Sequence, residues 1–415
     1  MSSSLTSRPT IEDLAERLRH ERQGFTMFFD YQIKTFEDWI DWLKAGNPAR
    51  WGLYYRTGAG KSITSLVMLR LKGYEEVLVI APPITHTDWH SLANALGMRA
   101  DTISHAKFRQ PDYKLDRHMP LIVDEFHLLG GHQGKGWKKL DRAALLMPAP
   151  IIICSATPNY NDAERVYCIQ HVLGPAVCRG GFLEFLYQNC NTRQNPFGQV
   201  PLVDEEHPFR HYEDAIEFLA SLPYMSYVPS NVSVEIDDVE IPSQVPGEFY
   251  AFGLNQRTGR IMASQMEARY QEMYINLVGD DGYMQPDVED MLTELVGMAS
   301  TPVILYCNSE KVTVALSATC ARNNANFEVI TGKTTTKEKA ERARLFREGK
   351  LDMLIGTASL ATGTDGFDKV CDCMIIVNDT PDASLRQQLI GRILPRGADS
   401  DASQKQVWRL VYPHA

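Results

Sequence analysis

The segment TGAGKS combines a glycine-rich turn with a lysine and a serine, the arrangement of loops that bind phosphate groups. Backbone N–H groups of such a turn point at phosphate oxygens, Lys61 can reach the β- and γ-phosphates, and Ser62 can hold Mg²⁺. In the full pattern G-x-x-x-x-G-K-[ST], the first glycine falls on residue 55, where this chain has tyrosine. Because the later glycines close the turn, we expect a nucleotide site despite this departure. The residues expected to hold the nucleotide here are Thr57, Gly58, Ala59, Gly60, Lys61 and Ser62.

Two adjacent carboxylates end a second apolar segment, LIVDEFH, at residues 121–127. Asp124 could orient Mg²⁺ through its water shell, and Glu125 could polarise a water that attacks the terminal phosphate. The alternative is an exposed acidic turn after a strand, but the lysine of the phosphate loop favours the catalytic interpretation. His127 either couples the nucleotide to another motif or is an ordinary cap residue.

A third segment, IIICSATP, places Ser155, Ala156 and Thr157 after an apolar run. Lys61, Asp124 and Ser155 stand at intervals of 63 and 31 residues. This order and spacing resembles motifs I, II and III of superfamily 2 helicases, of the DExH type. The resemblance implies that the residues of SAT couple nucleotide hydrolysis to movement.

Further segments extend the resemblance along the chain. FFDYQ is similar to the glutamine motif, which implies that Gln32 reads the edge of an adenine base. VLVIAPPITHTDW is similar to motif Ia, which implies a nucleic-acid contact at Pro82. GTASLATGTDG is similar to motif V, which implies that Thr357 contacts the nucleic-acid backbone and that Gly363 and Asp365 meet the nucleotide.

Motif VI of the family, Q-x-x-G-R-x-x-R, is similar to QQLIGRILPRG at residues 387–397. Gln388, a coupling residue, and Arg392 match, but the second arginine stands one place late, at Arg396, after Pro395. The resemblance implies that Arg392 is an arginine finger, which offsets charge developing on the γ-phosphate. Arg396 reaches the same phosphate only if the chain bends at Pro395, so we expect Arg392 to matter more.

Within superfamily 2, the sequence is most similar to chromatin-remodeller-type ATPases and phage-encoded helicases, through Trp89 and the segments ISHAKFR and SATPNYND. This resemblance implies an ATP-dependent DNA helicase or translocase that uses ATP and Mg²⁺. Its partner would be single-stranded, forked or duplex DNA, with replication or recombination proteins as further candidate partners. The alternatives are a duplex-DNA translocase that remodels junctions or protein–DNA complexes, an RNA helicase, and a non-catalytic nucleic-acid-binding module.

Parallel sheets are needed to position these motifs. Continuous apolar runs such as VLVIAPP and APIIICSA, separated by helical patterns, predict buried parallel strands. The runs stop near residue 190 and resume at TPVILYCNS, so we predict an α/β chain with two RecA-like, doubly wound lobes. The expected organisation is an N-terminal helical extension at 1–24, lobe 1 at 25–190, an acidic, partly helical connector at 191–295 and lobe 2 at 296–415.

The net charge of −10 is concentrated in the middle of the chain. Residues 200–299 contain 19 Asp and Glu, four Arg and no Lys, a net charge of −15, whereas both flanks are slightly basic. We therefore expect nucleic acid to bind the flanks. The acidic segment is then either a passive connector or a lid over the basic groove.

The lysine-rich stretch GGHQGKGWKK follows DEFH. Lys135 and Lys138 could contact phosphates while Trp137 stacks on a base, and a mobile, solvated loop is the alternative.

No apolar stretch approaches the ~20 residues that a membrane helix needs. The first residues lack the apolar region of a secretion signal, and the eight cysteines form no CxxC pair. We expect buried, reduced thiols in a cytoplasmic protein with no membrane partner, located in the host cytoplasm if the chain is phage-encoded.

Overall fold

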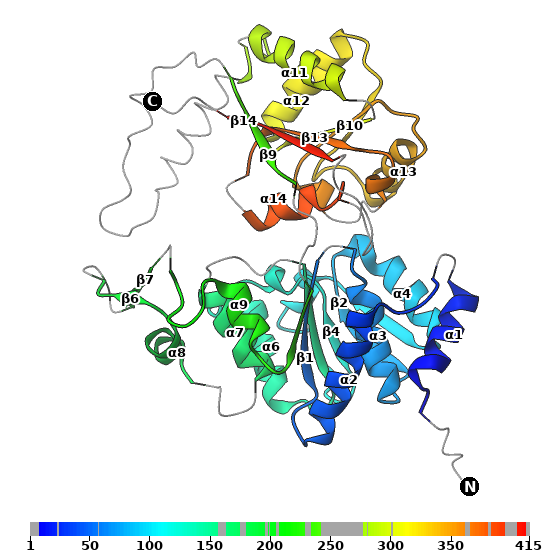
Figure 1. Ribbon diagram of the computed structural model, residues 1–415, viewed down its shortest axis with the longest axis vertical. Coiled ribbons are helices and arrows are strands. Elements are labelled where there is room, and N and C mark those ends of the chain that lie inside the picture. The colour runs from blue at the N-terminus through cyan, green and yellow to red at the C-terminus, as the bar shows by residue number, and fades with distance from the viewer. Residues whose placement is uncertain are drawn as a thin grey trace. The chain divides into compact units, whose positions relative to one another are not determined.

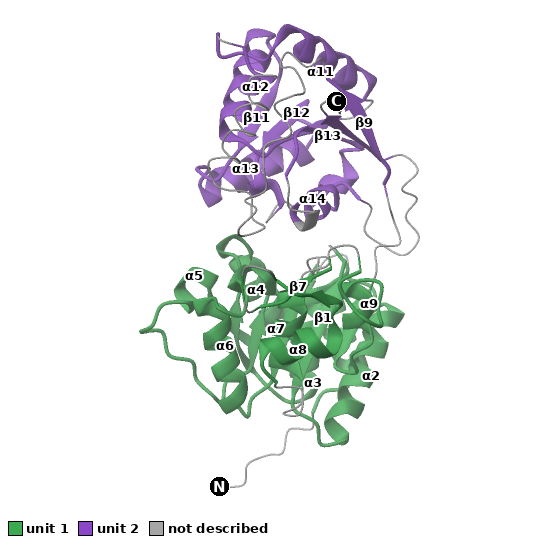
Figure 2. Cartoon of the chain, turned by 90° about the vertical axis from the view of Figure 1, so that its left-hand side faces the viewer, with its two compact units in different colours: residues 1–229 green, residues 230–415 purple. Residues whose placement is uncertain are grey.

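The computed structural model divides into two compact units, residues 1–229 and 230–415 (Figure 2). Each unit contains one six-stranded sheet. The structure describes residues 8–22, 25–56, 58–156, 163–174, 180–195, 198, 200–204, 207–228, 234–241, 277–279, 281–299, 302–361, 366–380, 383–394 and 405–411.

The sheet of the first unit has the order β3-β2-β4-β5-β1-β8, and all of its strand pairs are parallel (Figure 1). Its strands are β1 (Arg50–Tyr55), β2 (Glu76–Ile80), β3 (Arg99–Ile103), β4 (Leu121–Val123), β5 (Ile151–Ser155) and β8 (Met225–Val228). The four inner strands are the apolar runs that the sequence predicts, because helices bury both faces of a parallel sheet.

Two groups of helices cover this sheet. Helices α1 to α4 contact one another, as do α6 to α9, and Figure 1 shows the two groups on opposite sides of the strands. The helices are α1 (Ile11–Glu21), α2 (Asp30–Lys44), α3 (Lys61–Leu71), α4 (His86–Ala95), α5 (His105–Phe108), α6 (Lys135–Leu146), α7 (Ala163–Leu173), α8 (Phe182–Asn189) and α9 (Ala215–Ala220). Short 3₁₀ helices, η1 (Pro83–Thr85) and η2 (Phe126–Leu129), and a two-stranded ribbon, β6 (Thr192–Arg193) with β7 (Leu202–Val203), complete the unit.

The sheet of the second unit has the order β11-β12-β10-β13-β14-β9 and is also parallel throughout. Its strands are β9 (Ile236–Glu240), β10 (Val303–Cys307), β11 (Phe327–Ile330), β12 (Met353–Gly356), β13 (Cys373–Asn378) and β14 (Gln406–Val411). Its helices are α11 (Pro286–Met298), α12 (Glu310–Arg322), α13 (Thr336–Arg347) and α14 (Ala383–Ile390), with 3₁₀ helices η5 (Ala358–Ala361) and η6 (Phe367–Lys369).

Successive residues of a strand face opposite sides of the sheet, so the second unit has two apolar cores. Leu305 of β10 and Trp408 of β14 pack with α11 and α12, whereas Ile304 and Val407 pack with α13 and α14. The prediction of two RecA-like parallel α/β lobes is confirmed.

The acidic segment contributes to both units. Strand β8 pairs with β1 in the first sheet, whereas β9 pairs with β14 in the second. Helix α11 packs its apolar side chains into the second unit, and the strong helical pattern of residues 260–279 lies mostly outside the described residues. A separate connector domain at 191–295 stays a prediction. Within the described part of this segment, β8 belongs to the first sheet, β9 belongs to the second sheet and α11 packs in the second unit.

None of the helices in the described ranges is long and apolar enough to cross a membrane. The seven cysteines in these ranges are buried, and none of them forms a disulfide there.

Candidate nucleotide site and associated motifs

The phosphate loop joins the end of β1 to the first turn of α3, so its N–H groups lie at a helix N-terminus. Gly58 and Gly60 both have a φ of 79°, in the left-handed region that residues with a Cβ rarely adopt. A Cβ at Gly60 would also lie 2.7 Å from Nε2 of Gln32. The two glycines that the sequence retains are therefore the ones that the turn requires. Thr57 lies outside the described residues.

The side chain of Lys61 folds over the loop. Its ammonium group donates to the carbonyl oxygens of Tyr55 at 3.1 Å and Arg56 at 3.4 Å. A bound phosphate would replace these neutral acceptors by a charged one, and hydrogen bonds between charged partners are stronger. Ser62 follows in the first turn of α3.

Tyr55 stands where the pattern has its first glycine, and it is the last residue of β1. Its side chain is buried, and its hydroxyl lies 2.6 Å from Oγ1 of Thr35 on α2. The ring packs edge-on against Tyr31, with centroids 5.4 Å apart, and burial raises the pKa of the Tyr55 phenol. Tyr55 therefore belongs to the core between β1 and α2, and the turn forms after it.

Helix α2 also holds the loop through two further side chains. The hydroxyl of Tyr31 donates to the carbonyl of Ala59 at 3.0 Å, and Nε2 of Gln32 donates to Oγ1 of Thr64 at 2.9 Å. Oε1 of Gln32 accepts from the N–H of Phe29 at 3.0 Å. Gln32 is thus a buried brace of the loop in this structure, and its adenine-reading role stays a prediction.

Restoring the pattern's glycine should damage this site. Tyr55→Gly removes a buried ring, which costs about 3–5 kcal/mol of unfolding free energy for large aromatic residues, and it adds a flexible glycine to a strand. We expect a lower melting temperature and weaker nucleotide binding, whereas Tyr55→Phe should lose only the hydroxyl contact, about 1 kcal/mol. Thermal unfolding and titration with a fluorescent nucleotide measure both. A Tyr55→Gly variant that is as stable as the wild type and binds nucleotide more tightly would show that the loop lacks a needed glycine.

The motifs of the first unit meet at one edge of its sheet. The phosphate loop follows β1, the carboxylates follow β4, and Ser155 ends β5, which lies between those two strands. Ligands of open parallel sheets bind at the carboxyl ends of the strands. The sheet order therefore brings Lys61, Asp124 and Ser155 to the edge where a nucleotide is expected.

Asp124 is buried beside a second carboxylate. Burial, with the added charge of Glu125, raises the pKa of Asp124 to about 7, while Lys61 and a hydrogen bond with Trp89 act in the opposite direction. Burial is the main cause of this raised pKa, because a carboxylate away from water is disfavoured unless a cation lies beside it. The oxygen ligands of Asp124 and Ser62 are the kind that Mg²⁺ takes, so these residues fit a magnesium site.

The backbone around Glu125 is held in an uncommon conformation. Glu125 has a φ of 48°, and such left-handed residues cluster at functional sites. Nε2 of His105 donates to the carbonyl of Asp124 at 2.8 Å. Burial lowers the pKa of His105 to about 4, so the ring is neutral at pH 7, and Nε2 carries the proton because a carbonyl only accepts. His105 therefore holds the turn that presents Glu125.

His127 lies between the carboxylates and the end of β5. Its Nδ1 is 3.4 Å from Oγ of Ser155 and 3.4 Å from a carboxylate oxygen of Glu125. The guanidinium of Arg165 on α7 donates to the carbonyl of His127. The structure thus brings His127 and Ser155 together, with Ala156 next in the chain, and Thr157 lies outside the described residues.

In the second unit, Gln388 and Arg392 are buried. The guanidinium of Arg392 donates to the carbonyl of Ala361 in η5, and Lys339 of α13 donates to the carbonyl of Ser359 in the same turn. Burial and the charge of Arg392 lower the pKa of Lys339 to about 8. Two cations thus hold the turn that follows β12.

Thr357 precedes this turn at 9% exposure, and its N–H donates to the carbonyl of Ile330 at 3.1 Å. Gly363, Asp365 and Arg396 lie outside the described residues.

The residues expected to contact nucleic acid in the first unit differ in exposure. Lys135 and Lys138 are exposed on α6, where Lys138 donates to Gln133 at 2.9 Å. Pro82 is buried, and its carbonyl accepts from the hydroxyl of Thr85 at 2.9 Å. Their contacts with nucleic acid stay predictions.

The base-stacking role of Trp137 is wrong for this structure, and so is the mobile loop over residues 135–139. These residues begin α6, and Trp137 is 6% exposed and packs against Tyr167 and His171. The helix forms because Trp137, Leu140 and Ala144 share a buried face, a spacing that the sequence already contained.

Several residues that hold the site were not predicted from the sequence. They are Tyr31, Thr35, His105, Arg165 and Lys339. They act through contacts with other parts of the chain, and only the segments FFDYQ, which contains Tyr31, and ISHAKFR, which contains His105, gave a signal in the sequence.

Residues 287–396 match the family described as helicase conserved C-terminal domain. No curated protein matches the sequence.

Solved structures share the two-lobed fold. S. cerevisiae Dbp5 bound to RNA and ADP BeF3 aligns with a TM-score of 0.56 and 14% identity, covering 96% of this chain and 87% of that chain. A single-residue variant of Dbp5 bound to the same ligands aligns with a TM-score of 0.57 and 14% identity, covering 99% and 90% of the two chains. The second unit therefore contains a segment that matches a helicase conserved C-terminal domain, and the two units together share the two-lobed fold of these solved structures.

Proposed function

We propose that this chain is a superfamily 2 helicase that hydrolyses ATP with Mg²⁺ and uses the reaction to move along DNA. The observation that carries the proposal is the sheet edge of the first unit, where the phosphate loop, the DEFH carboxylates and Ser155 follow β1, β4 and β5. A chain that had kept only a binding function would have no need of Lys61, Glu125 and Arg392 together.

Each of these residues has a defined part in the proposed reaction. Lys61 offsets charge on the β- and γ-phosphates, and Glu125 orients and polarises the attacking water. Ser62 and Asp124 would hold Mg²⁺, which supplies charge neutralisation on the phosphates. Arg392, from the other unit, offsets the charge that develops on the γ-phosphate.

Movement follows if the state of the nucleotide changes how each unit holds nucleic acid. His127 and Ser155 support such coupling, because they connect Glu125 with the end of the neighbouring strand. Thr357 in the second unit, and Pro82, Lys135 and Lys138 in the first, are the proposed nucleic-acid contacts.

DNA is the preferred substrate because the segments around Trp89 and His105 resemble chromatin-remodeller-type ATPases. Translocation on duplex DNA without strand separation uses the same residues. RNA is the second candidate, and the RNA in the Dbp5 structures favours it, although 14% identity shows the fold alone.

Stimulation of ATP turnover distinguishes these substrates. Turnover should be measured with single-stranded, duplex and forked DNA and with RNA, beside strand displacement on the fork. We expect DNA to stimulate most, and Glu125→Gln to bind ATP but turn it over slowly. Stimulation by duplex DNA without displacement would identify a translocase, and stimulation by RNA alone would overturn the DNA assignment.

A further inference from the structure

Strand β9 brings an acidic side chain onto the face of the second sheet that carries motif VI. In the parallel pair β14–β9, Asp238 stands directly opposite Arg409. Ile236 and Val407, two residues earlier on each strand, pack into the core formed with α13 and α14. Because side chains alternate along a strand, Asp238 and Arg409 extend the same face toward the carboxyl ends of the strands.

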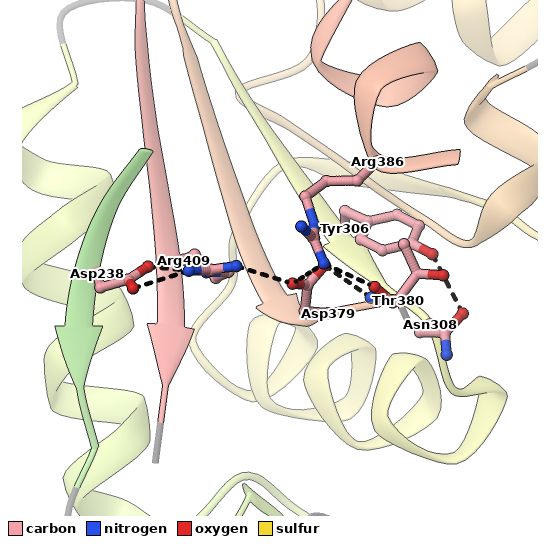
Figure 3. Close-up of polar contacts among 7 residues, drawn as sticks. All are labelled: Asp238, Tyr306, Asn308, Asp379, Thr380, Arg386 and Arg409. Atoms are coloured by element: carbon pink, nitrogen blue, oxygen red, sulfur yellow. Dashed lines mark hydrogen bonds and ion pairs between the residues drawn. The ribbon is translucent and has the colours of Figure 1, made fainter. Parts of the chain in front are cut away.

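Arg409 joins two carboxylates from different elements (Figure 3). Its Nε and Nη2 donate to the two carboxylate oxygens of Asp238, each at 2.7 Å. Its Nη1 donates to Oδ2 of Asp379 at 3.3 Å. Asp379 is the residue that follows β13, so Arg409 connects the edge strand with the end of an inner strand.

Asp379 in turn holds the first half of α14. Nε of Arg386 donates to Oδ1 of Asp379 at 2.9 Å, and Nη2 lies 2.8 Å from Oδ2. The same Nη2 donates to the carbonyl of Thr380 at 2.9 Å. Arg386 therefore connects α14 to the end of β13. The carboxylate of Asp379 accepts hydrogen bonds from two arginines, Arg386 and Arg409, which approach it from opposite sides (Figure 3).

The four charges alternate in sign along this series. The side chains of Arg409, Asp379 and Arg386 are 25%, 18% and 25% exposed, and that of Asp238 is 45% exposed. Bidentate pairs between arginine and carboxylate fix geometry as well as adding energy, and partial burial protects them from screening by salt. Loss of Asp238 would leave two arginines facing one carboxylate.

We propose that Asp238, Arg409, Asp379 and Arg386 form a positioning network through which β9 sets the orientation of α14. The inference rests on the proposed function, because Gln388 and Arg392 stand two and six residues after Arg386. These four residues touch no nucleotide in this proposal. They act through the position of α14. The acidic segment thus affects ATP turnover because it supplies Asp238.

The neighbouring residue provides a matched control. Asp237 lies on the same strand, but its carboxylate accepts only a long contact, 3.4 Å, from Nε2 of Gln406 within the described structure. Asp237→Asn and Asp238→Asn change the net charge equally and keep side-chain volume. If the acidic segment is instead a lid held by its charge, both variants should raise basal ATP turnover alike.

The test compares Asp238→Asn, Arg409→Gln and Asp237→Asn in the full chain with saturating nucleic acid. We expect the first two to lower kcat for ATP about tenfold, because a charged pair is lost, while KM for ATP changes less than about twofold. Asp237→Asn should match the wild type in both constants. Asp238→Asn combined with Arg386→Gln should cost less than the sum of the two single changes, since the network is then already broken.

Hydrogen exchange gives a readout that does not depend on activity. Amides of residues 383–390 should exchange faster in Asp238→Asn than in Asp237→Asn, while those of α11 and α12 on the other face stay unchanged. Equal exchange in α14, or a rise in basal turnover with both variants, would overturn the network. A wild-type chain that no nucleic acid stimulates would instead remove the proposed function, and the exchange comparison would still decide whether β9 positions α14.

Discussion

Lys61→Ala should reduce ATP turnover by at least about 100-fold, the scale on which single groups that stabilise transition-state charge act. The β- and γ-phosphates would lose their side-chain cation. Arg70 is the other basic residue of α3, and at nine residues further along the helix it lies too far from the loop to replace Lys61. The fold should persist, because the hydrogen bonds that the ammonium group of Lys61 donates to the carbonyls of Tyr55 and Arg56 lie at the loop itself and outside the apolar core. Steady-state ATP hydrolysis and a thermal melt measure the two effects.

Lys44→Ala is the matched control for this experiment. Lys44 ends α2, and its side chain is 71% exposed and paired with Asp41 at the surface. Its removal should leave turnover and melting temperature close to those of the wild type. Near-normal turnover in Lys61→Ala would show that the loop is not the catalytic site. A much lower melting temperature in this variant would show that its loss of turnover comes from unfolding.

Arg392→Ala should give the second large loss, about 10³–10⁵-fold in kcat where arginine fingers act elsewhere, with ATP binding largely retained. Arg396→Ala should cost much less, because the motif places this arginine one position late, after Pro395. The comparison needs single-turnover hydrolysis beside nucleotide binding, so that chemistry and affinity are separated.

The contact between Arg392 and Ala361 complicates the alanine variant, since its loss also frees the turn of η5. Arg392→Lys keeps a cation but cannot reproduce the planar guanidinium, so it should remain strongly impaired. Equal losses in Arg392→Ala and Arg396→Ala would indicate that Pro395 bends the chain enough to present both arginines. Full activity in Arg392→Lys would indicate that charge alone is needed.

The inner strands could be predicted from the sequence because burial on both faces leaves a continuous apolar run. The edge strands β3, β8 and β9 could not. RADTI in β3 is polar at alternate positions, MSYV in β8 is four residues long, and IDDVE in β9 carries three acids. An edge strand has one neighbouring strand and more contact with solvent, so these three strands carry polar residues or are too short to stand out from the loops around them.

The site divides in the same way. Lys61, Asp124 and Arg392 follow from local patterns, because phosphate chemistry demands those residue types at those spacings. The role of Tyr55 could not be predicted in this way, because it depends on a hydroxyl contact with Thr35, twenty residues away in the sequence. The pairing of Asp238 with Arg409 spans 171 residues, and no local pattern contains it.

That long separation has a consequence for how the chain is made. During synthesis β9 emerges well before β14, the strand it pairs with, and for that interval its N–H and C=O groups face solvent as an open edge. Unpaired backbone groups of this kind can form a β-sheet with another nascent chain, and charged side chains reduce such pairing. We therefore expect Asp237, Asp238 and Glu240 to reduce such pairing while the chain is being made, and the outer edge of β9 keeps these charges after β14 has paired and Arg409 has bound Asp238.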